Sequence, residues 1–343
     1  MGGNLVRDRP MQSVSARARL RMLGLASLFI ALAACAPAPS LEHDPRDPAS
    51  AMLEALTGVE STVREVRFPD PGVLPADHDG AGYHLQGVQA LPGGGLVLSG
   101  SAAESSYFFV ADSEGRVRHL ERLDEVRAHA GGFQIDGGLL AVGIERQGER
   151  DGGSEVRVFD VSDAFAPRAL PHLTIRRAAL TAGAVGIASD ARGALLVVGS
   201  WDSEQLDFHR LEGEPSDPRA RWSDPISWRA DREGLAPGSI GRDWPPYQGV
   251  FLVGLADGAL GLVGLYSGVP FVGHDHADFH WLTFGQDGRP EIVRFARLAL
   301  PQEEGRRFQS AGGLVVHASP PVLELIACDH QIDHDVVRCT AWR

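Results

Sequence analysis

The sequence contains no lysine, because all 32 of its basic residues are arginine. This absence excludes enzymes that form a Schiff base or attack with an amine. The G-x-S-x-G, Walker, H-E-x-x-H and C-x-x-C patterns are also missing, which removes support for the common hydrolase, nucleotide-binding, metalloprotease and thiol-redox classes. No local motif therefore identifies a catalytic residue.

Aromatic residues make up only 7% of the chain, but 43% of it is hydrophobic and 22% is charged, which suits a folded domain with a sizeable core. The formal net charge is −13, and residues 1–34 hold five arginines and one aspartate, so the remainder carries −17. An acidic surface repels phosphate backbones, and we expect no nucleic-acid partner. Acidity also keeps a protein soluble and monomeric, so the charge identifies no partner by itself.

The N-terminus has no apolar run long enough to span a bilayer. Three arginines, Arg17, Arg19 and Arg21, precede the apolar residues 22–32, which indicates an export signal. The run ends in Leu32-Ala33-Ala34-Cys35, which resembles the lipobox of bacterial lipoproteins, where the cysteine becomes the first mature residue and carries the lipid. A plain signal peptide with an incidental Cys35 is the alternative.

The resemblance divides the chain into a signal peptide at 1–34, a lipidated (palmitate) tether at 35–61 rich in proline, and a folded domain at 62–343. Translation starts at Met1 or Met11. The residue after the cysteine is Ala36, not the aspartate that commonly retains such lipoproteins at the inner membrane. The resemblance therefore implies a cell-envelope protein, held at the outer membrane if the host is Gram-negative and bound to membrane only through its lipid anchor.

The folded domain is built from repeats. His84-Leu-Gln-Gly-Val-Gln89 recurs as His129-Ala-Gly-Gly-Phe-Gln134, with the same H-x-x-G-x-Q pattern. A glycine followed by apolar residues starts further units at Gly183, Gly249 and Gly312, so the five units begin at steps of 45, 51, 66 and 63 residues. A period of this size indicates propeller blades or a solenoid.

Each unit contains short β-like runs separated by glycine, proline and serine turns, and four such strands make one propeller blade. The fifth unit has only three runs, and Val63–Phe68 is able to supply the fourth strand. We predict an all-β fold, a β-propeller of five four-stranded blades closed by an N-terminal strand. A sixth blade formed from the insertion at 212–246 is the alternative. Within the second unit, Val156-Arg-Val-Phe-Asp-Val-Ser-Asp163 resembles the LVIVD-type repeat of bacterial propellers.

Two of the three cysteines, Cys328 and Cys339, fall on consecutive predicted strands of the last unit. If the chain turns near residues 331–335, they lie opposite each other within disulfide reach, and export to an oxidising compartment favours the bond. Two buried free thiols are the alternative.

In a propeller, the loops that enter the innermost strands and those that join the second and third strands gather on one face around the axis. The ligand-binding candidates on these loops are His84, Gln86, His129, Trp201, Asp202, Tyr247, Gln248, Asp329 and His330. For the paired histidines, and for Gln89 and Gln134, the alternative is a structural one: a repeated polar side chain bonds a neighbouring backbone group and ties two blades together.

The densest polar cluster is His274-Asp275-His276-Ala277-Asp278-Phe279-His280. In it, His274, His276, Asp278 and His280 have the same parity and share one face of an extended segment. Imidazoles and a carboxylate are suitable ligands for zinc or another divalent metal, and we expect this segment to join the two paired histidines in one pocket. A solvated loop with scattered histidines is the alternative. No other cofactor is predicted.

The missing catalytic motifs and the predicted anchor favour a non-enzymatic module of the cell envelope that binds a small molecule, a glycan or a protein. The second hypothesis is a hydrolase or lyase on the same axial face, either metal-assisted or based on a carboxylate pair assembled from distant loops. A structural role in envelope assembly is the third. Propellers serve all of these functions, so the fold alone does not choose between them.

Overall fold

The computed structural model describes residues 60–69, 84–102, 105–146, 148–149, 152–200, 203–230, 244–255, 259–267, 274–302, 306–318, 321–333 and 335–343. The predicted signal peptide, the tether as far as Val59, and the candidates Cys35, Trp201 and Asp202 lie outside these residues. Within them the fold is all-β, with a four-residue helix α2 (Phe308–Ala311) and a three-residue 3-10 turn η2 (Pro171–Leu173). No described helix is long and apolar enough to cross a membrane.

The described strands form antiparallel meanders in which each strand pairs with the next. The first meander contains β2 (Leu85–Ala90), β3 (Leu96–Ser101), β4 (Ser106–Ala111) and β5 (Val117–Asp124). The second contains β6 (His129–Asp136), β7 (Leu139–Glu145), β8 (Ser154–Asp160) and β10 (Ile175–Arg177), with the short β9 (Arg168–Ala169) beside β8.

The third and fourth meanders follow the same plan. The third contains β11 (Ala184–Asp190), β12 (Gly193–Gly199), β13 (Gln205–Glu212) and β15 (Ile226–Arg229), with the short β14 (Arg221–Trp222) beside β13. The fourth contains β16 (Gly249–Gly254), β17 (Leu260–Ser267), β18 (His274–Phe284) and β19 (Pro290–Pro301).

The fifth meander combines both ends of the domain. It contains β21 (Gly312–Ala318), β22 (Pro321–Asp329), β23 (Val336–Trp342) and β1 (Ser61–Arg67), with the short β20 (Arg306–Arg307) beside β22. The N-terminal β1 pairs antiparallel with β23 along its whole length, from Ser61 opposite Trp342 to Arg67 opposite Val336. Phe68, which follows β1, is fully buried, so this segment is part of the core.

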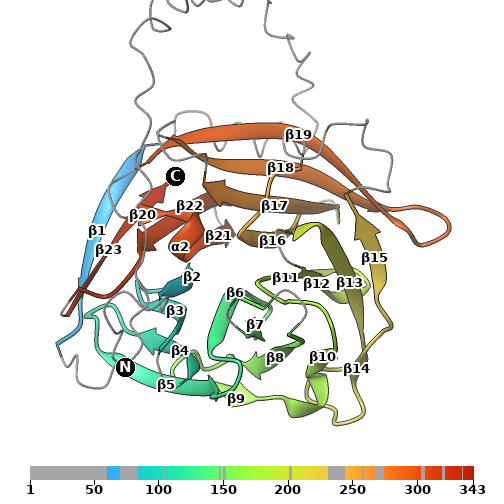
Figure 1. Cartoon of the computed structure of the whole chain (residues 1–343), viewed down its shortest axis with the longest axis horizontal. Helices are drawn as coiled ribbons and strands as arrows, with labels where there is room; N and C mark the ends of the chain where they lie inside the picture. The colour runs from blue at the N-terminus through green and yellow to red at the C-terminus, as the bar shows by residue number, and fades with distance from the viewer. Residues whose placement is uncertain are drawn as a thin grey trace, which may run out of the picture. The chain divides into compact units, whose positions relative to one another are not determined.

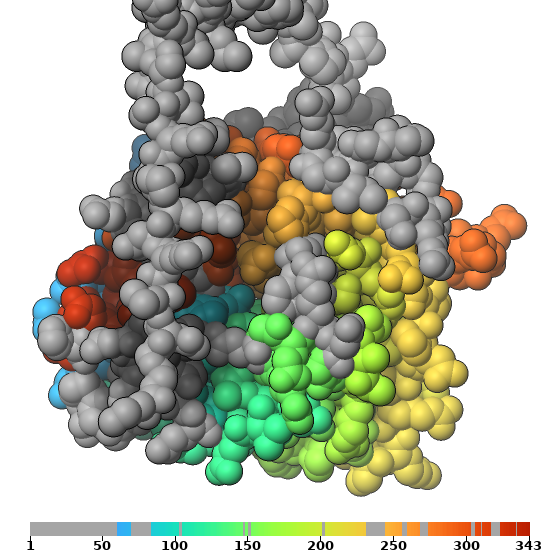
Figure 2. Space-filling view, viewed as in Figure 1, coloured from blue at the N-terminus to red at the C-terminus, as the bar shows by residue number. Residues whose placement is uncertain are grey.

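The first strands of successive meanders contact one another: β2 contacts β6, β6 contacts β11, β11 contacts β16, β16 contacts β21, and β21 contacts β2. Figure 1 shows these strands in the middle of the domain and β5, β10, β15, β19 and β1 at its outside. The surface of the same face shows the meanders succeeding one another in chain order around the centre (Figure 2).

A hydrophobic cluster fills the space between each meander and the next. Each sheet contributes to two such clusters, because a strand directs alternate side chains to its two faces. Val97 on β3 packs with Phe133 and Phe159 of the second meander. The neighbouring Leu98 faces the other way and joins Ile326 of the fifth meander. Comparable clusters lie between the second and third, third and fourth, and fourth and fifth meanders. Sheets that bury both faces against their neighbours in this way form a β-propeller.

Gly186 on β11 lies where two first strands approach each other closely. A Cβ on Gly186 would lie 2.8 Å from the carbonyl oxygen of Val250 on the next first strand, so only glycine fits. The repeated glutamines tie these strands together. Gln134 accepts the amides of Ile187 and Leu252, each at 2.9 Å, and Gln89 accepts the amide of Ile135 at 2.8 Å. The structural interpretation of these two glutamines is thus confirmed.

Two alternatives that the sequence left open concern described strands. The described part of the 212–246 insertion pairs with β13 as the two-residue β14 and the outer strand Ile226–Arg229, and it builds no sheet of its own. The segment from His274 to Asp278 is not a solvated loop but the first half of the eleven-residue strand β18, because it pairs with both β17 and β19.

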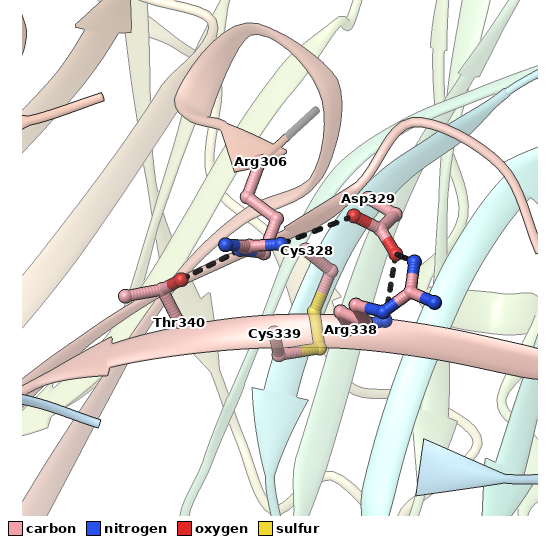
Figure 3. Close-up of a disulfide and its surroundings, with 6 residues drawn as sticks. All are labelled: Arg306, Cys328, Asp329, Arg338, Cys339 and Thr340. Carbon is pink, nitrogen blue, oxygen red and sulfur yellow. Dashed lines mark hydrogen bonds and ion pairs between the residues drawn. A yellow bond between two sulfur atoms is a disulfide. The ribbon is translucent and has the colours of Figure 1, made fainter. Parts of the chain in front are cut away.

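The predicted disulfide is present. Cys328 on β22 lies directly opposite Cys339 on β23, with their Cα atoms 4.0 Å apart and the two sulfurs bonded (Figure 3). The Asp329 side chain accepts the amide of Arg338 at 2.8 Å, and Arg306 donates to Thr340 at 2.8 Å. Both cysteines are buried, and they brace the hairpin that carries Asp329 and His330.

Candidate functional site

A cavity of about 490 Å³, here called the central cavity, lies at the ends of the first strands where the chain enters them. Its walls come from all five meanders or the segments that lead into them. It is lined by His84, Gln86, His129, Glu145, Gly148, Thr181, Gly183, Ala184, Ser200, Tyr247, Gln248, Arg307, Gln309 and His330.

The two H-x-x-G-x-Q segments reach the central cavity through irregular strand starts. The register of β2 shifts between Leu85 and Gly87, and the register of β6 shifts between Ala130 and Phe133. An extra residue in one strand changes the direction of the side chains around it, and such bulges are frequent beside functional sites. The same local irregularity therefore accompanies both histidines of the repeated motif.

Three imidazole rings meet in the central cavity. The His84 ring stacks on His330 with 4.9 Å between ring centroids and 7° between planes, and it lies 5.3 Å from the ring of His129. Gln86 is buried, and its Oε1 lies 2.5 Å from Nε2 of His84. Burial lowers the pKa of His330 below its ordinary value, so this imidazole is neutral at pH 7.

His129 faces a carboxylate. It is the direct cross-strand neighbour of Glu145, and its Nδ1 lies 3.4 Å from Glu145 Oε1. The other oxygen of Glu145 accepts the amide of Ala182 at 2.7 Å, which holds the carboxylate in place. Nδ1 of His129 is buried and has no hydrogen-bond partner among the described residues. The pair has the arrangement of a base and its orienting acid, at the longer distance that unliganded sites often show.

A second charged pair, buried next to Glu145, holds the adjoining backbone in place. Arg177 donates to Asp207 at 2.6 Å, and both side chains are only 6% exposed. Arg177 also donates to the carbonyl of Thr181, the residue before Ala182. Burial lowers the pKa of Arg177, and attraction to Asp207 and Glu145 opposes this shift. The backbone at 181–182 is thus held between Arg177 and Glu145.

The wall opposite is anchored by Tyr247. Its hydroxyl donates to Asp278 at 2.7 Å and lies 3.0 Å from His280 Nε2. Asp278 is fully buried and also accepts two hydrogen bonds of 2.6 Å from Arg297. Burial raises the pKa of Tyr247 above its ordinary value and lowers the pKa of His280 to about 3. Tyr247 is therefore a neutral, rigid wall residue.

The structure brings together most of the ligand-binding candidates. His84, Gln86, His129, Tyr247, Gln248 and His330 all line the central cavity. Asp329 does not line it, because its carboxylate faces Arg306 and Arg338 (Figure 3). Trp201 and Asp202 lie outside the described residues.

The set His274, His276, Asp278 and His280 does not line the central cavity, although the sequence predicted that it would. It lies on β18, the third strand of its meander, and reaches the cavity only indirectly through Tyr247. Within the described residues, no group of three or more histidine, cysteine, aspartate or glutamate side chains is arranged to hold a metal ion. Metal binding by this set stays a prediction without geometric support.

The lining residues that were not singled out from the sequence include Glu145, Thr181 and Arg307. Glu145 belongs to a loop of the expected kind, but nothing in the sequence distinguishes it from the other acidic residues there. Arg307 lies on β20, a short strand with no counterpart in the other units, so the repeat pattern was unable to reveal it.

A larger cavity of about 1010 Å³ lies at the other ends of the first strands. Its charged side chains have partners within the protein: Arg343 lies 2.8 Å from Glu324, Asp136 accepts a hydrogen bond of 2.8 Å from Ser189, and Asp190 lies 2.8 Å from Arg210. Among the described residues, no imidazole lines it. We therefore place the candidate chemistry in the smaller, central cavity.

No protein-family model matches the chain, and no curated protein matches it in sequence. Solved structures that it resembles include the GH43 endo-arabinanase from Bacillus licheniformis (11% identity, TM-score 0.43, covering 77% of this chain and 94% of that one). They also include the exo-β-1,3-galactanase from Clostridium thermocellum (9% identity, TM-score 0.43, covering 81% of this chain and 61% of that one). A third is the virginiamycin B lyase from Staphylococcus aureus (9% identity, TM-score 0.38, covering 82% of this chain and 99% of that one). At these values, no substrate or catalytic residue is transferred to this chain.

The main function predicted from the sequence, a non-enzymatic binding module, is wrong. The solved structures named above are enzymes, but their TM-scores are too low to carry a function over to this chain. The observation on this chain itself is that the central cavity contains a largely buried histidine and carboxylate beside two stacked imidazoles. The enzymatic alternative accounts for this arrangement better.

Proposed function

We propose that this protein is an enzyme that cleaves a polar substrate in the central cavity, by hydrolysis or elimination, with imidazoles as general acid and base. The observation that carries the proposal is the His129–Glu145 pair, with Nδ1 and Oε1 3.4 Å apart, in the same cavity as the stacked rings of His84 and His330.

Glu145 orients the base. When its Oε1 accepts a hydrogen bond from Nδ1 of His129, the tautomer is set and Nε2 is left to accept a proton from water or from the substrate. The protonated His129 then gives this proton to the leaving group, beside the stacked rings of His84 and His330. Each of these steps requires only groups that line the central cavity, and no metal takes part in them.

Two buried polar atoms of the central cavity support a ligand-binding role. Nδ1 of His129 and the hydroxyl of Thr181 have no hydrogen-bond partner among the described residues. An unsatisfied buried polar group costs about 1–3 kcal/mol, so its retention needs a reason. A substrate that bonds to Thr181, and whose binding closes the 3.4 Å gap between His129 and Glu145, supplies one.

We also propose that the five meanders are the blades of a closed ring, with β1 as the outer strand of the fifth blade. The pairing of β1 with β23 and the successive contacts of the first strands support this interpretation. Closure gives the cavity a rigid wall on every side, which a positioned acid and base require.

The experiment is a turnover assay with purified protein on a panel of glycans, including arabinan and galactan, and of lactones and cyclic esters. His129→Gln and Glu145→Gln should each lower kcat for any active substrate by about 10²–10⁴-fold. The matched control is His119→Gln, because His119 lies 3.2 Å from Glu121 on the outer strand β5, away from the cavity. Absence of turnover across the panel, or an equal loss in the control, would contradict the proposal.

We further propose that Cys35 carries a lipid that holds the enzyme at the cell envelope. Replacing Cys35 with Ser should abolish fatty-acid labelling and release the protein from the membrane fraction. Unchanged labelling or membrane association in this variant would contradict the anchor and leave the enzymatic proposal untouched.

A further inference from the structure

Arg307 lines the central cavity, and no described residue forms an ion pair with it. Its side chain forms no ion pair or hydrogen bond with any residue that the structure describes. Most other cavity-facing and buried arginines are paired; Arg177 and Arg297, for example, each bind a buried aspartate at 2.6 Å. In a domain whose net charge is strongly negative, an unpaired guanidinium in a cavity requires an explanation.

The strand geometry explains why Arg307 faces the cavity. Arg306 and Arg307 form β20, and adjacent strand residues direct their side chains to opposite sides. Arg306 turns to the disulfide hairpin, where it donates to Thr340 at 2.8 Å and lies 3.8 Å from Asp329 (Figure 3). Since β20 pairs with β22 through Arg306 and Asp329, Arg307 is directed the other way.

The rest of the cavity wall is rich in hydrogen-bonding groups. Beside the imidazoles it presents the amides of Gln86, Gln248 and Gln309 and the hydroxyls of Thr181 and Ser200. Among the described lining residues, those without a polar side chain are Ala184 and two glycines. Most small-molecule sites are lined mainly by apolar groups, so this composition selects a ligand with many hydroxyl groups.

The hydroxyl of Thr181 is free to bind a hydroxyl group of such a ligand. Thr181 is only 1% exposed, lines the central cavity, and has a hydroxyl without a partner among the described residues. A buried hydroxyl in this state gains a hydrogen bond when a ligand hydroxyl arrives. This observation is independent of the charge on Arg307.

We propose that the central cavity takes an acidic sugar, in which Arg307 binds the carboxylate or phosphate through paired N–H···O hydrogen bonds and the polar wall binds the hydroxyls. A guanidinium presents its donors in a planar fork that matches such groups. As a statement about the substrate this rests on the proposed function, but as a statement about binding it stands alone.

The test is calorimetric titration of the purified protein with matched saccharides: uronate-containing disaccharides, sugar phosphates, and the neutral counterpart of each. The acidic sugars should bind about 10- to 100-fold more tightly than their neutral counterparts, the range expected for a charge-assisted hydrogen bond. Preference for uronates or for phosphates distinguishes the two sources of the anion.

Arg307→Gln should abolish this preference while leaving the weak binding of neutral sugars. Arg219→Gln is the matched control, because it removes the same charge from a turn where the side chain is 90% exposed. Equal binding of acidic and neutral sugars, no binding of either, or a preference that survives in Arg307→Gln would overturn the inference.

Binding and turnover separate the two proposals. Titration of the His129→Gln variant measures binding without the proposed base. If acidic sugars bind through Arg307 but are never cleaved, the enzymatic proposal fails and this inference stands. If a substrate is cleaved but acidic sugars bind no more tightly than their neutral counterparts, this inference fails and the enzymatic proposal stands.

Discussion

Arg177 and Asp207 form an ion pair of 2.6 Å between two side chains that are each 6% exposed. Asp207 accepts further hydrogen bonds from Gln205 and Ser227, so both oxygens of the carboxylate have hydrogen-bond donors. Burial acts to raise the pKa of Asp207, but the hydrogen bonds from Ser227 and Gln205 and the attraction of Arg177 outweigh it and lower the pKa. The pair joins β10 to β13 and supports the backbone that holds Glu145.

Replacing Arg177 with Met should lower the free energy of unfolding by about 3–5 kcal/mol, because Asp207 is left buried without its counter-charge. Urea denaturation measures this loss. Arg219→Gln, which breaks an exposed pair with Asp217, should change the same quantity by less than about 1 kcal/mol. The double variant Arg177→Met/Asp207→Leu should recover most of the stability, and equal losses in the single and double variants would contradict the explanation.

Stability should fall as the pH is lowered from about 7 towards 3, partly because of His280. Its pKa is lowered to about 3 in the folded protein, mainly by burial, whereas the unfolded chain takes up the proton near pH 6.5. Between these values the unfolded state binds more protons, so the folded state loses up to about 1.4 kcal/mol per pH unit from this group.

His280→Gln retains an N–H donor for Tyr247 and does not titrate, so unfolding measured by urea between pH 7 and 4 should show a shallower pH dependence. Comparison at pH 8, where the His280 side chain is neutral in both states, gives the cost of the substitution itself. An unchanged slope would show that His280 does not contribute to acid sensitivity.

Deleting the chain through Phe68 removes β1 and leaves the edge of β23 unpaired. An exposed strand edge templates association, so this truncation should aggregate, as measured by light scattering and gel filtration. Deleting only as far as Gly58 retains Ser61–Arg67 and the buried Phe68 and should leave a monodisperse protein. Identical behaviour of the two truncations would contradict the role given to β1.

The disulfide should stabilise the last hairpin. With 11 residues of sequence separation, Cys328→Ser/Cys339→Ser should lower the free energy of unfolding by about 2–3 kcal/mol, since the unfolded chain gains freedom. Cys35→Ser is the control for loss of a cysteine and should leave unfolding of the domain unchanged. A double variant as stable as the parent would show that β22 and β23 are held by their packing alone.

The repeated H-x-x-G-x-Q motif was the most informative part of the sequence. It marked the starts of β2 and β6 and the glutamines that tie first strands together, because backbone groups buried at the centre need hydrogen-bond partners. The histidine-rich segment was misleading. Parity correctly put its side chains on one face, but it is unable to distinguish a third strand from a loop at the centre.

The all-β class, the opposed cysteines and most of the polar wall of the central cavity could be predicted from the sequence, because apolar alternation, turn residues and repeat spacing are local properties of the chain. The chemistry of that cavity could not, because it depends on how the strands pair and pack in three dimensions. Antiparallel pairing of β6 with β7 brings His129 to Glu145, the unrepeated strand β20 directs Arg307 inward, and packing of the fifth meander against the first stacks His330 on His84. These arrangements depend on strand register and on packing between meanders, which residue spacing alone does not predict.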